Sequence, residues 1–195
     1  MVSRLAERPD MPLRKDRSPV LLMNDPARRR ASDLIRGLDR VLVAFSGGID
    51  STLVLRLACQ ELWANVVAVT AISPSLARRD LEVSQEIARE IGVPHELIKS
   101  GETEDSRYQR NDPQRCYFCK TELYTRLENI LPQLDVDVMV NGANVDDQGD
   151  HRPGMVAAGE HAVRSPLLDV GLTKQDVRDL ARHWDLPVWD KPAMP

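Results

Sequence analysis

The sequence predicts an α/β fold: an open parallel sheet of about five strands with helices on both faces, in three layers. Apolar stretches of strand length alternate along the chain with stretches of helical periodicity. The strand-length stretches are also apolar throughout, as expected of parallel strands that are buried on both faces. Strands joined in this way should have right-handed crossovers, and such a sheet binds ligands beyond the carboxyl ends of its strands.

The predicted elements follow one another from residue 41. We expect five strands, at residues 41–45, 65–72, 95–98, 136–140 and 186–189. We expect helices between and after them, at residues 50–63, 77–91, 117–131 and 173–184.

The first two strand–helix units are predicted from periodicity. Residues 41–45 (VLVAF) and 65–72 (NVVAVTAI) are almost wholly apolar, which is typical of central strands. In the helix between them, Val54 and Leu57 lie on the same apolar face. The following helix should end at Gly92, because glycine adopts the left-handed conformation that closes helices.

The later elements are predicted from their boundaries. A short strand at 95–98 is followed by a polar, loop-like stretch at 100–115. Pro132 is expected to stop the next helix, because proline has no N–H to donate within a helix. Thr173 and Asp176 have the spacing of a capping box, which predicts the start of the last helix.

Composition limits the classes of function. A chain of 195 residues with 42% apolar and 29% charged residues is long enough for one domain with a core. The net charge of −4 and the aromatic content of 4% argue against a nucleic-acid partner. No stretch approaches the ~18 apolar residues of a membrane span, and three cysteines are too few for a disulfide scaffold. We therefore expect a small-molecule partner and a cytoplasmic location.

Residues 1–30 differ from the rest of the chain. They carry eight basic and four acidic side chains, four prolines and no sustained periodicity. We interpret them as a basic, mostly disordered leader before a domain at 31–195. A transit peptide or a wrongly assigned start codon are the alternatives, although acidic residues are unusual in transit peptides.

The loop after the first strand is the principal candidate site. Residues 46–51 (SGGIDS) join a buried strand to a helix N-terminus, which attracts phosphate through its free N–H groups and its dipole. Ser46, Ser51 and Thr52 add hydroxyl donors. Asp50 can hold a Mg²⁺ ion that offsets phosphate charge. The string lacks the lysine of a Walker loop and the G-x-G-x-x-G of a dinucleotide fold. The alternative to a phosphate loop is a glycine turn in which Asp50 is an ordinary helix cap.

These six residues resemble the pyrophosphate loop of the ATP pyrophosphatase (PP-loop) superfamily, whose fold is called adenine nucleotide alpha hydrolase-like. Its members cleave ATP between the α- and β-phosphates. The resemblance covers residues 35–195. Further strings resemble the LarE family in particular, at residues 112–120 (DPQRCYFCK), 141–147 (NGANVDD), 150–154 (DHRPG), 164–167 (RSPL), 172–174 (LTK) and 191–195 (KPAMP).

The LarE resemblance implies an activity. Family members are ATP-dependent sulfur transferases of nickel-pincer nucleotide biosynthesis. They adenylylate a carboxylate of a pyridinium-dicarboxylate mononucleotide and release pyrophosphate, and sulfur then displaces AMP. Adenylylation makes chemical sense, because a carboxylate is a poor electrophile and AMP is a good leaving group. Two alternatives stay open: an amide-forming synthetase of the NAD or GMP synthetase kind, and a non-catalytic ATP-binding fragment.

The resemblance also implies roles for individual residues. Catalytic roles fall to Asp50, Lys120 and Arg164. Substrate binding falls to Arg152, Arg164 and Lys174. ATP binding falls to Ala44, Ser46, Gly47, Gly48, Asp50, Ser51, Thr52, Ala71, Gly142 and Asn144. On residue chemistry, Asp50, Asp146 and Asp150 are the candidate Mg²⁺ ligands, and Asp146 and Asp150 either bind a second metal or cap loops.

Cys116 and Cys119 form a C-x-x-C pair at the start of a predicted helix. On residue chemistry alone the pair is a zinc half-site or a redox pair. In one LarE branch it joins a third cysteine to hold a [4Fe-4S] cluster that carries the transferred sulfur. That third cysteine follows the string at 191–195, whereas Cys59 is expected in the core. The resemblance thus implies ATP, Mg²⁺ and an iron–sulfur cluster as cofactors, a missing C-terminal region, and a homo-oligomer whose interface lies partly in that region.

Overall fold

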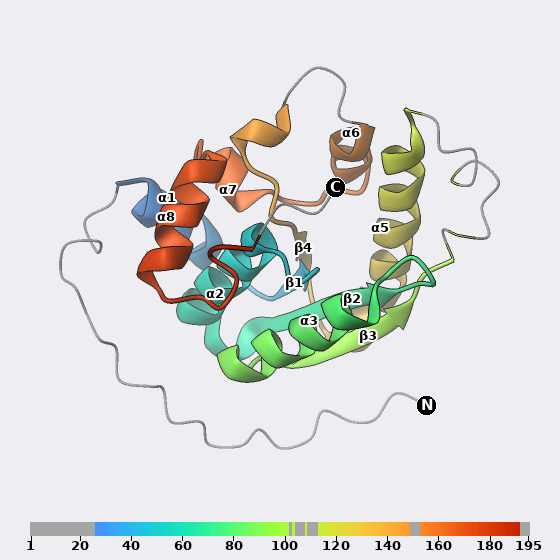
Figure 1. The fold of residues 1–195 in the computed structure, drawn as a ribbon, viewed down its shortest axis with the longest axis horizontal. Coiled ribbons are helices and arrows are strands. Elements are labelled where there is room, and N and C mark those ends of the chain that lie inside the picture. The colour runs from blue at the N-terminus through green and yellow to red at the C-terminus, as the bar shows by residue number, and fades with distance from the viewer. Residues whose placement is uncertain (1–25, 102, 104–107, 109–112, 149–152, 192–195) are drawn as a thin grey trace.

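The computed structural model describes residues 26–101, 103, 108, 113–148 and 153–191. Its four strands are β1 (Val41–Ala44), β2 (Val66–Ile72), β3 (His95–Lys99) and β4 (Val138–Val140). They pair in parallel in the order β3-β2-β1-β4 (Figure 1). The chain therefore adds strands on one side of β1 and returns to its other side, so that the order reverses next to β1.

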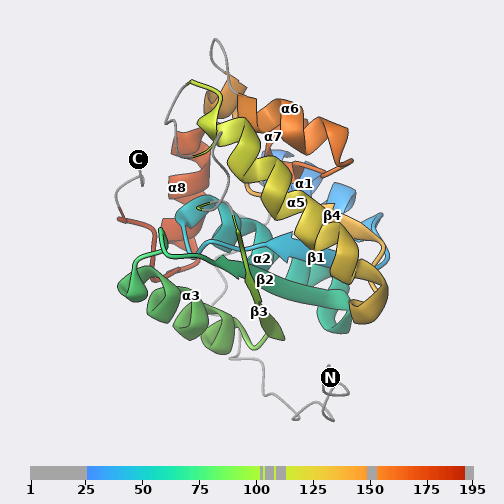
Figure 2. The ribbon, with the colours of Figure 1, turned by 90° about the vertical axis from the view of Figure 1, so that its right-hand side faces the viewer.

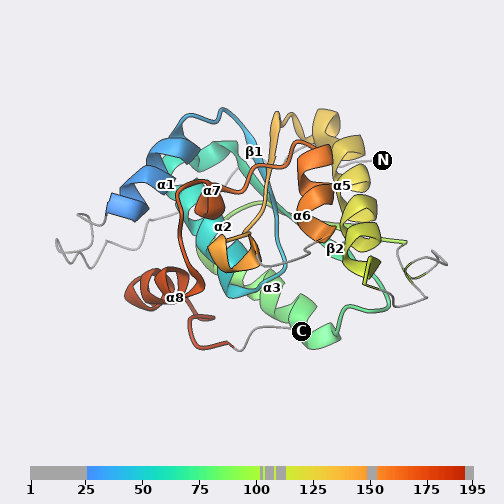
Figure 3. The same cartoon turned by 90° about the horizontal axis from the view of Figure 1, so that it is seen from above.

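Helices cover both faces of the sheet. Figure 3 shows two groups of helices on opposite sides of the strands. The first group is α1 (Pro26–Arg36), α2 (Ile49–Leu62), α3 (Arg78–Ile91), α7 (Pro166–Asp169) and α8 (Lys174–His183). The second group is α5 (Arg115–Leu134) and α6 (Pro153–Glu160), which lie side by side in Figure 2 and pack against each other. Two 3-10 helices, η1 (Trp63–Asn65) and η3 (Val145–Gln148), complete the described elements.

Alternation along the strands divides the apolar side chains between two cores. Val41 and Val43 belong to the cluster formed with α1, α2 and α8, while Leu42 belongs to the cluster with α5 and α6. Successive side chains of a strand point to opposite faces, so a wholly apolar strand supplies both cores. The three-layer parallel α/β prediction is confirmed.

The predicted fifth strand is wrong. Residues 186–189 form turns, in which the Trp189 N–H donates to the Leu186 carbonyl oxygen over 3.1 Å. Leu186 and Val188 are buried, but in the first core rather than in a sheet. Pro187 lacks the N–H that a ladder needs, and Asp185 has a φ of +51°, which turns the chain. The apolar side chains of Leu186 and Val188 therefore indicated burial, not that the segment is a strand.

The predicted end of the third helix is also wrong. α5 continues through Pro132 to Leu134, where Asp135 closes it at a φ of +54°. Leu131 and Leu134 pack against the second core. A proline near a helix end costs only one hydrogen bond, and the apolar contacts of the last turn offset that cost.

Three α-helices in the described part of the chain were not predicted. α1 begins at Pro26, so its first turn lies within the stretch 1–30 that was expected to be a disordered leader, while residues 1–25 fall outside the described part. α6 and α7 are short, and their sequences are too short for a clear period. The capping box of α8 is confirmed: the Thr173 side chain accepts from the Asp176 N–H, and Asp176 accepts from the Thr173 N–H. No helix in the described ranges combines the length and apolar character needed to cross a membrane.

Candidate nucleotide site

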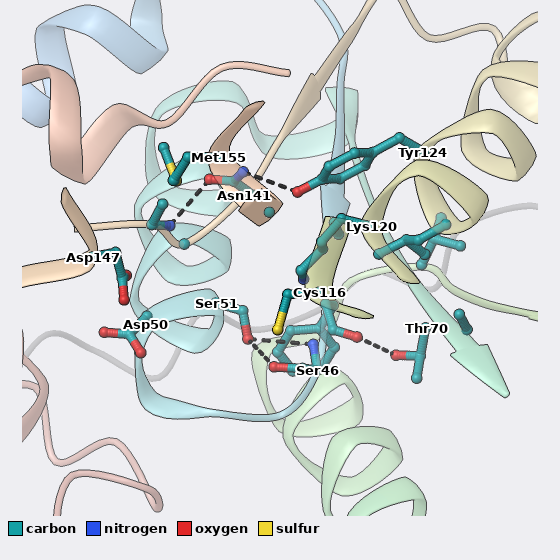
Figure 4. A pocket seen from close by; sticks show the side chains of 18 of the residues that line it. Ser46, Asp50, Ser51, Thr70, Cys116, Lys120, Tyr124, Asn141, Asp147 and Met155 are labelled. Carbon is teal, nitrogen blue, oxygen red and sulfur yellow. Dashed lines mark hydrogen bonds between the residues drawn. The ribbon is translucent and has the colours of Figure 1, made fainter. Parts of the chain in front are cut away.

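A cavity of about 570 Å³ opens at the carboxyl ends of β1, β2 and β4 (Figure 4). It lies beside the point where the strand order reverses, as expected for an open parallel sheet. One side is formed by the loop that joins β1 to α2, and the opposite side by α5 and the start of α6. The lining residues are Ala44, Phe45, Ser46, Asp50, Ser51, Val69, Thr70, Ala71, Leu76, Pro113, Cys116, Lys120, Leu123, Tyr124, Asn141, Gly142, Ala143, Asp147, Pro153, Gly154 and Met155.

The loop between β1 and α2 is held by its own hydroxyl groups. Ser51 Oγ donates to the Gly48 carbonyl oxygen over 3.1 Å and lies 3.1 Å from Ser46 Oγ. Gly48 is the N-cap of α2 and provides no side-chain cap, so the first N–H groups of the helix face the loop without a side-chain acceptor. That arrangement suits a bound phosphate.

Gly47 is required by the conformation of this loop. Its φ is +69°, which is unfavourable for residues with a side chain. A Cβ at this position would also lie 3.0 Å from Ser84 Cβ on α3. Positive φ and close packing therefore both select glycine.

Gly142 brings the chain after β4 against the start of α2. A Cβ at Gly142 would lie 2.6 Å from the backbone nitrogen of Ser51 and 2.7 Å from the carbonyl carbon of Asp50. Only glycine permits such an approach between two backbones. Two distant loops thereby form a single site.

Asp50 is bound on both of its carboxylate oxygens. Oδ1 accepts a hydrogen bond of 3.0 Å from the Asn144 side-chain amide, and Oδ2 pairs with the Lys174 ammonium group. Asn144 is buried, and the Lys174 and Asp50 side chains are about one quarter exposed. Asp50, Asn144 and Lys174 come from three separate segments, and the structure brings them together.

Asp146 and Asp147 have different surroundings. Asp146 Oδ2 accepts from the Lys174 N–H over 2.6 Å, so this carboxylate caps the start of α8. Asp147 Oδ2 accepts from the Asn144 N–H over 3.1 Å, and Asp147 lines the cavity on the same side as Asp50 (Figure 4). Of the two alternatives for Asp146, the structure contains the loop-capping contact.

The opposite wall carries longer side chains from α5. Figure 4 shows Cys116 and Lys120 pointing into the cavity from this helix. Lys120 is the only lysine or arginine among the described lining residues. Its ammonium nitrogen lies 6.0 Å from the centre of the Tyr124 ring, at the edge of cation–π range. This wall can therefore offer one positive charge to a ligand.

A hydrogen-bonded chain supports the residue just before the phosphate loop. Thr70 Oγ1 donates to the Phe45 carbonyl oxygen over 2.7 Å and lies 2.7 Å from His95 Nε2. Because the Thr70 hydroxyl hydrogen is used on Phe45, His95 Nε2 must be the donor to Thr70. Burial lowers the pKa of His95 below its ordinary value.

Several residues assigned roles by resemblance do not line the cavity. Gly47 and Gly48 belong to the phosphate loop, and Asn144 donates to Asp50, but none of the three is a lining residue. Thr52 is fully buried, and its hydroxyl has no hydrogen-bond partner among the described residues. The Arg164 side chain is half-exposed and lies 3.5 Å from the Asp169 carboxylate, outside the lining. Asp150 and Arg152 lie outside the described residues.

Sequence reasoning missed five lining residues with polar or aromatic groups: Phe45, Thr70, Tyr124, Asn141 and Asp147. Asn141 and Asp147 were part of a quoted string, and the place of that string after a strand was the available signal. Tyr124 had no comparable signal, because an aromatic residue within a helix is most often a core residue.

The three cysteines differ in environment, and the structure records no disulfide among them. Cys59 lies in α2 against the first core, and burial raises the pKa of its thiol to about 12. Cys116 is exposed at the cavity, and Cys119 lies one turn further along α5. Cys59 is therefore a partly buried residue that packs against the core.

Together, the parallel sheet, the SGGIDS loop and the cavity at the strand ends define a PP-loop domain of the adenine nucleotide alpha hydrolase-like fold. The family profile described as "Queuosine biosynthesis protein QueC" matches residues 40–106. An NH3-dependent NAD synthetase from Campylobacter jejuni superimposes with a TM-score of 0.67 and 18% identity, over 87% of this chain and 77% of the other. An NMN synthetase from Francisella tularensis gives 0.65 and 16%, over 86% and 74%.

The chain belongs to the LarE family. It is 36% identical over 160 residues to the pyridinium-3,5-bisthiocarboxylic acid mononucleotide synthase of Lactiplantibacillus plantarum, a match of 82% of this chain and 58% of that protein. It is 46% identical over 158 residues to an uncharacterized protein of Synechocystis sp., a match of 81% of this chain and 59% of that protein. The chain thus spans somewhat over half the length of these relatives.

Proposed function

We propose that this chain uses ATP to adenylylate a carboxylate of a pyridinium-dicarboxylate mononucleotide, as the activating step of sulfur transfer. The observation that carries the proposal is the single cavity that joins the SGGIDS loop and Asp50 to Lys120 on the opposite wall. The relationship to a synthase of a pyridinium bisthiocarboxylic acid mononucleotide supports this choice of acceptor.

The proposed reaction is an exchange at the α-phosphorus. A carboxylate oxygen of the acceptor forms a bond to that phosphorus, the bond from it to the bridging oxygen breaks, and pyrophosphate leaves. The products are an acyl adenylate and pyrophosphate. In the later step a sulfur nucleophile replaces AMP at the acyl carbon and leaves a thiocarboxylate.

The residues of the chain have separate tasks in this proposal. The N–H groups at the start of α2 bind the phosphates that become pyrophosphate, because they are donors next to the positive end of the helix dipole. Lys174, now paired with Asp50, adds positive charge at the same end. Lys120 holds the acceptor carboxylate against the α-phosphate, which lowers the entropic cost of bringing two anions together.

Mg²⁺ fits the donor set at the phosphate end. Asp50 and Asp147 are carboxylates on the same side of the cavity, and Mg²⁺ in nucleotide sites usually takes one or two carboxylates with phosphate oxygens. Asp50 and Asp147 would hold the ion, which would offset the negative charge that builds up on the leaving pyrophosphate. Within the described ranges no cluster of three or more potential metal ligands occurs.

A [4Fe-4S] cluster does not fit the cysteines present. Such a cluster takes three or four thiolates. Cys116 and Cys119 supply two, and Cys59 faces the first core from α2 with a strongly raised pKa. No step of the proposed reaction is therefore derived through a cluster.

Product analysis tests the proposal. The chain is mixed with Mg-ATP and the pyridinium-dicarboxylate mononucleotide, and AMP, ADP and pyrophosphate are quantified. We expect AMP and pyrophosphate, with the rate reduced about a hundredfold or more in Asp50→Asn. Asp179→Asn, which removes an exposed carboxylate of α8 that accepts from Gln175, is the matched control. ADP as the product contradicts the proposal, and ATP binding without AMP indicates a binding module.

A further inference from the structure

The orientation of the Asn141 side chain is fixed by a backbone donor. Asn141 Oδ1 accepts from the Ala143 N–H over 3.0 Å and from Ser165 Oγ over 2.9 Å. A backbone N–H can only donate, so the atom facing it must be the amide oxygen. The amide nitrogen therefore faces Tyr124, whose hydroxyl oxygen lies 3.2 Å away.

This orientation determines the role of the Tyr124 hydroxyl. The oxygen accepts from Asn141, so its own hydrogen needs a different acceptor. Among the described residues, Tyr124 also makes a ring contact with His161, 5.9 Å away between ring centres, and a contact with the Lys120 ammonium group. Neither is a hydrogen-bond acceptor for the hydroxyl. The side chain is 1% exposed, yet it lines the cavity.

A buried hydroxyl that keeps a free hydrogen needs an acceptor, because an unmade buried hydrogen bond is costly. Since Tyr124 lines the cavity, a ligand bound there can supply that acceptor. Lys120 lies on the same helix one turn earlier and also lines the cavity. A neutral donor next to a cation matches an anion with two acceptor atoms, such as a carboxylate.

We propose that Tyr124 is a specificity-determining residue that donates a hydrogen bond from its hydroxyl to a carboxylate oxygen of the acceptor. The assignment of that carboxylate to the acceptor rests on the proposed function. Through Asn141 the same hydroxyl is linked to the loop at Ala143, which borders the phosphate end of the cavity.

The test compares two tyrosine substitutions on α5. Tyr124→Phe removes the hydroxyl and keeps the ring in the second core. Tyr117→Phe is the matched control, because the Tyr117 hydroxyl donates to Glu160 over 2.7 Å outside the cavity lining. The probe is pyridine-3,5-dicarboxylate, and its dissociation constant and that of ATP are measured by calorimetry.

We expect Tyr124→Phe to weaken probe binding about tenfold, as for a hydrogen bond to a charged group, while ATP binding changes less than about twofold. Tyr117→Phe should leave both constants unchanged. Equal probe binding by the wild type and Tyr124→Phe overturns the inference, as does a wild type that does not bind the probe. A parallel loss of ATP binding in Tyr124→Phe also overturns it, because a structural role would act through Asn141.

The two proposals can fail separately. If Tyr124→Phe weakens probe binding but the wild-type chain forms no AMP, the carboxylate contact stands and the proposed adenylylation is wrong. If AMP forms at the same rate and acceptor KM in Tyr124→Phe as in the wild type, adenylylation stands and the role of Tyr124 is wrong.

Discussion

The two sides of the cavity are constructed differently. The phosphate side consists of backbone and short polar side chains, with Gly142 placed so closely that an added Cβ would be 2.6 Å from the Ser51 nitrogen. The α5–α6 wall consists of longer side chains on helices, including Lys120, Tyr124 and Met155. The phosphate side therefore tolerates almost no change of shape, whereas the wall also carries side chains outside the core, such as Lys120 and Met155, that can change without disturbing the sheet. This division suits a protein that binds one nucleotide and selects an acceptor.

Gly142→Ala should have the largest effect, because the new methyl group meets two backbones that cannot move independently. We expect the free energy of unfolding to fall by about 2–3 kcal/mol and ATP binding to weaken by at least about tenfold. Denaturant unfolding and calorimetry measure the two effects.

Gly159→Ala is the control for this substitution. It lies in α6, and an added Cβ there meets nothing within 4 Å. It should leave ATP binding unchanged and stabilise the helix slightly, since alanine is the better helix former. Equal effects of the two substitutions would show that the phosphate side is not the more rigid one.

Lys174→Gln should have the next largest effect. Asp50 loses its cationic partner, and the phosphates lose a positive charge at the same end of the cavity. We expect ATP binding to weaken about tenfold while binding of a carboxylate probe at the α5–α6 wall stays the same. Arg178→Gln, which changes an exposed residue of the same helix, should alter neither. A matching loss of probe binding would contradict the separation of the two sides.

His95→Gln should have the smallest effect, and it depends on pH. The pKa of His95 is lowered in the folded chain, so the unfolded chain binds the proton more readily. His95 therefore contributes stability above the ordinary histidine pKa, and this is lost as pH falls through the lowered value. The difference between the melting temperatures at about pH 7.5 and about pH 5 should therefore be smaller in His95→Gln than in the wild type. An unchanged pH dependence of the melting temperature in His95→Gln would refute the assignment.

The phosphate side of the cavity could be predicted from the sequence better than the α5–α6 wall. The SGGIDS loop was predicted because a strand end, two glycines and a helix start are adjacent in the chain. Asp147 and Tyr124 were missed because their positions beside Asp50 and Asn141 depend on segments that are far apart in sequence. Arg164 was assigned from a matched string, but its side chain lies at the surface beside Asp169.

The sequence by itself determined the parallel α/β class, the strands β1 to β4, the helices α2, α3, α5 and α8, and the phosphate loop. These follow from local periodicity and from glycine conformations, which depend on near neighbours. Only the tertiary structure decided that residues 186–189 pack without joining the sheet, that α5 passes Pro132, and that Asp50 meets Asn144 and Lys174. Burial, helix continuation and ion pairing at these places depend on contacts between distant segments, and no local pattern encodes them.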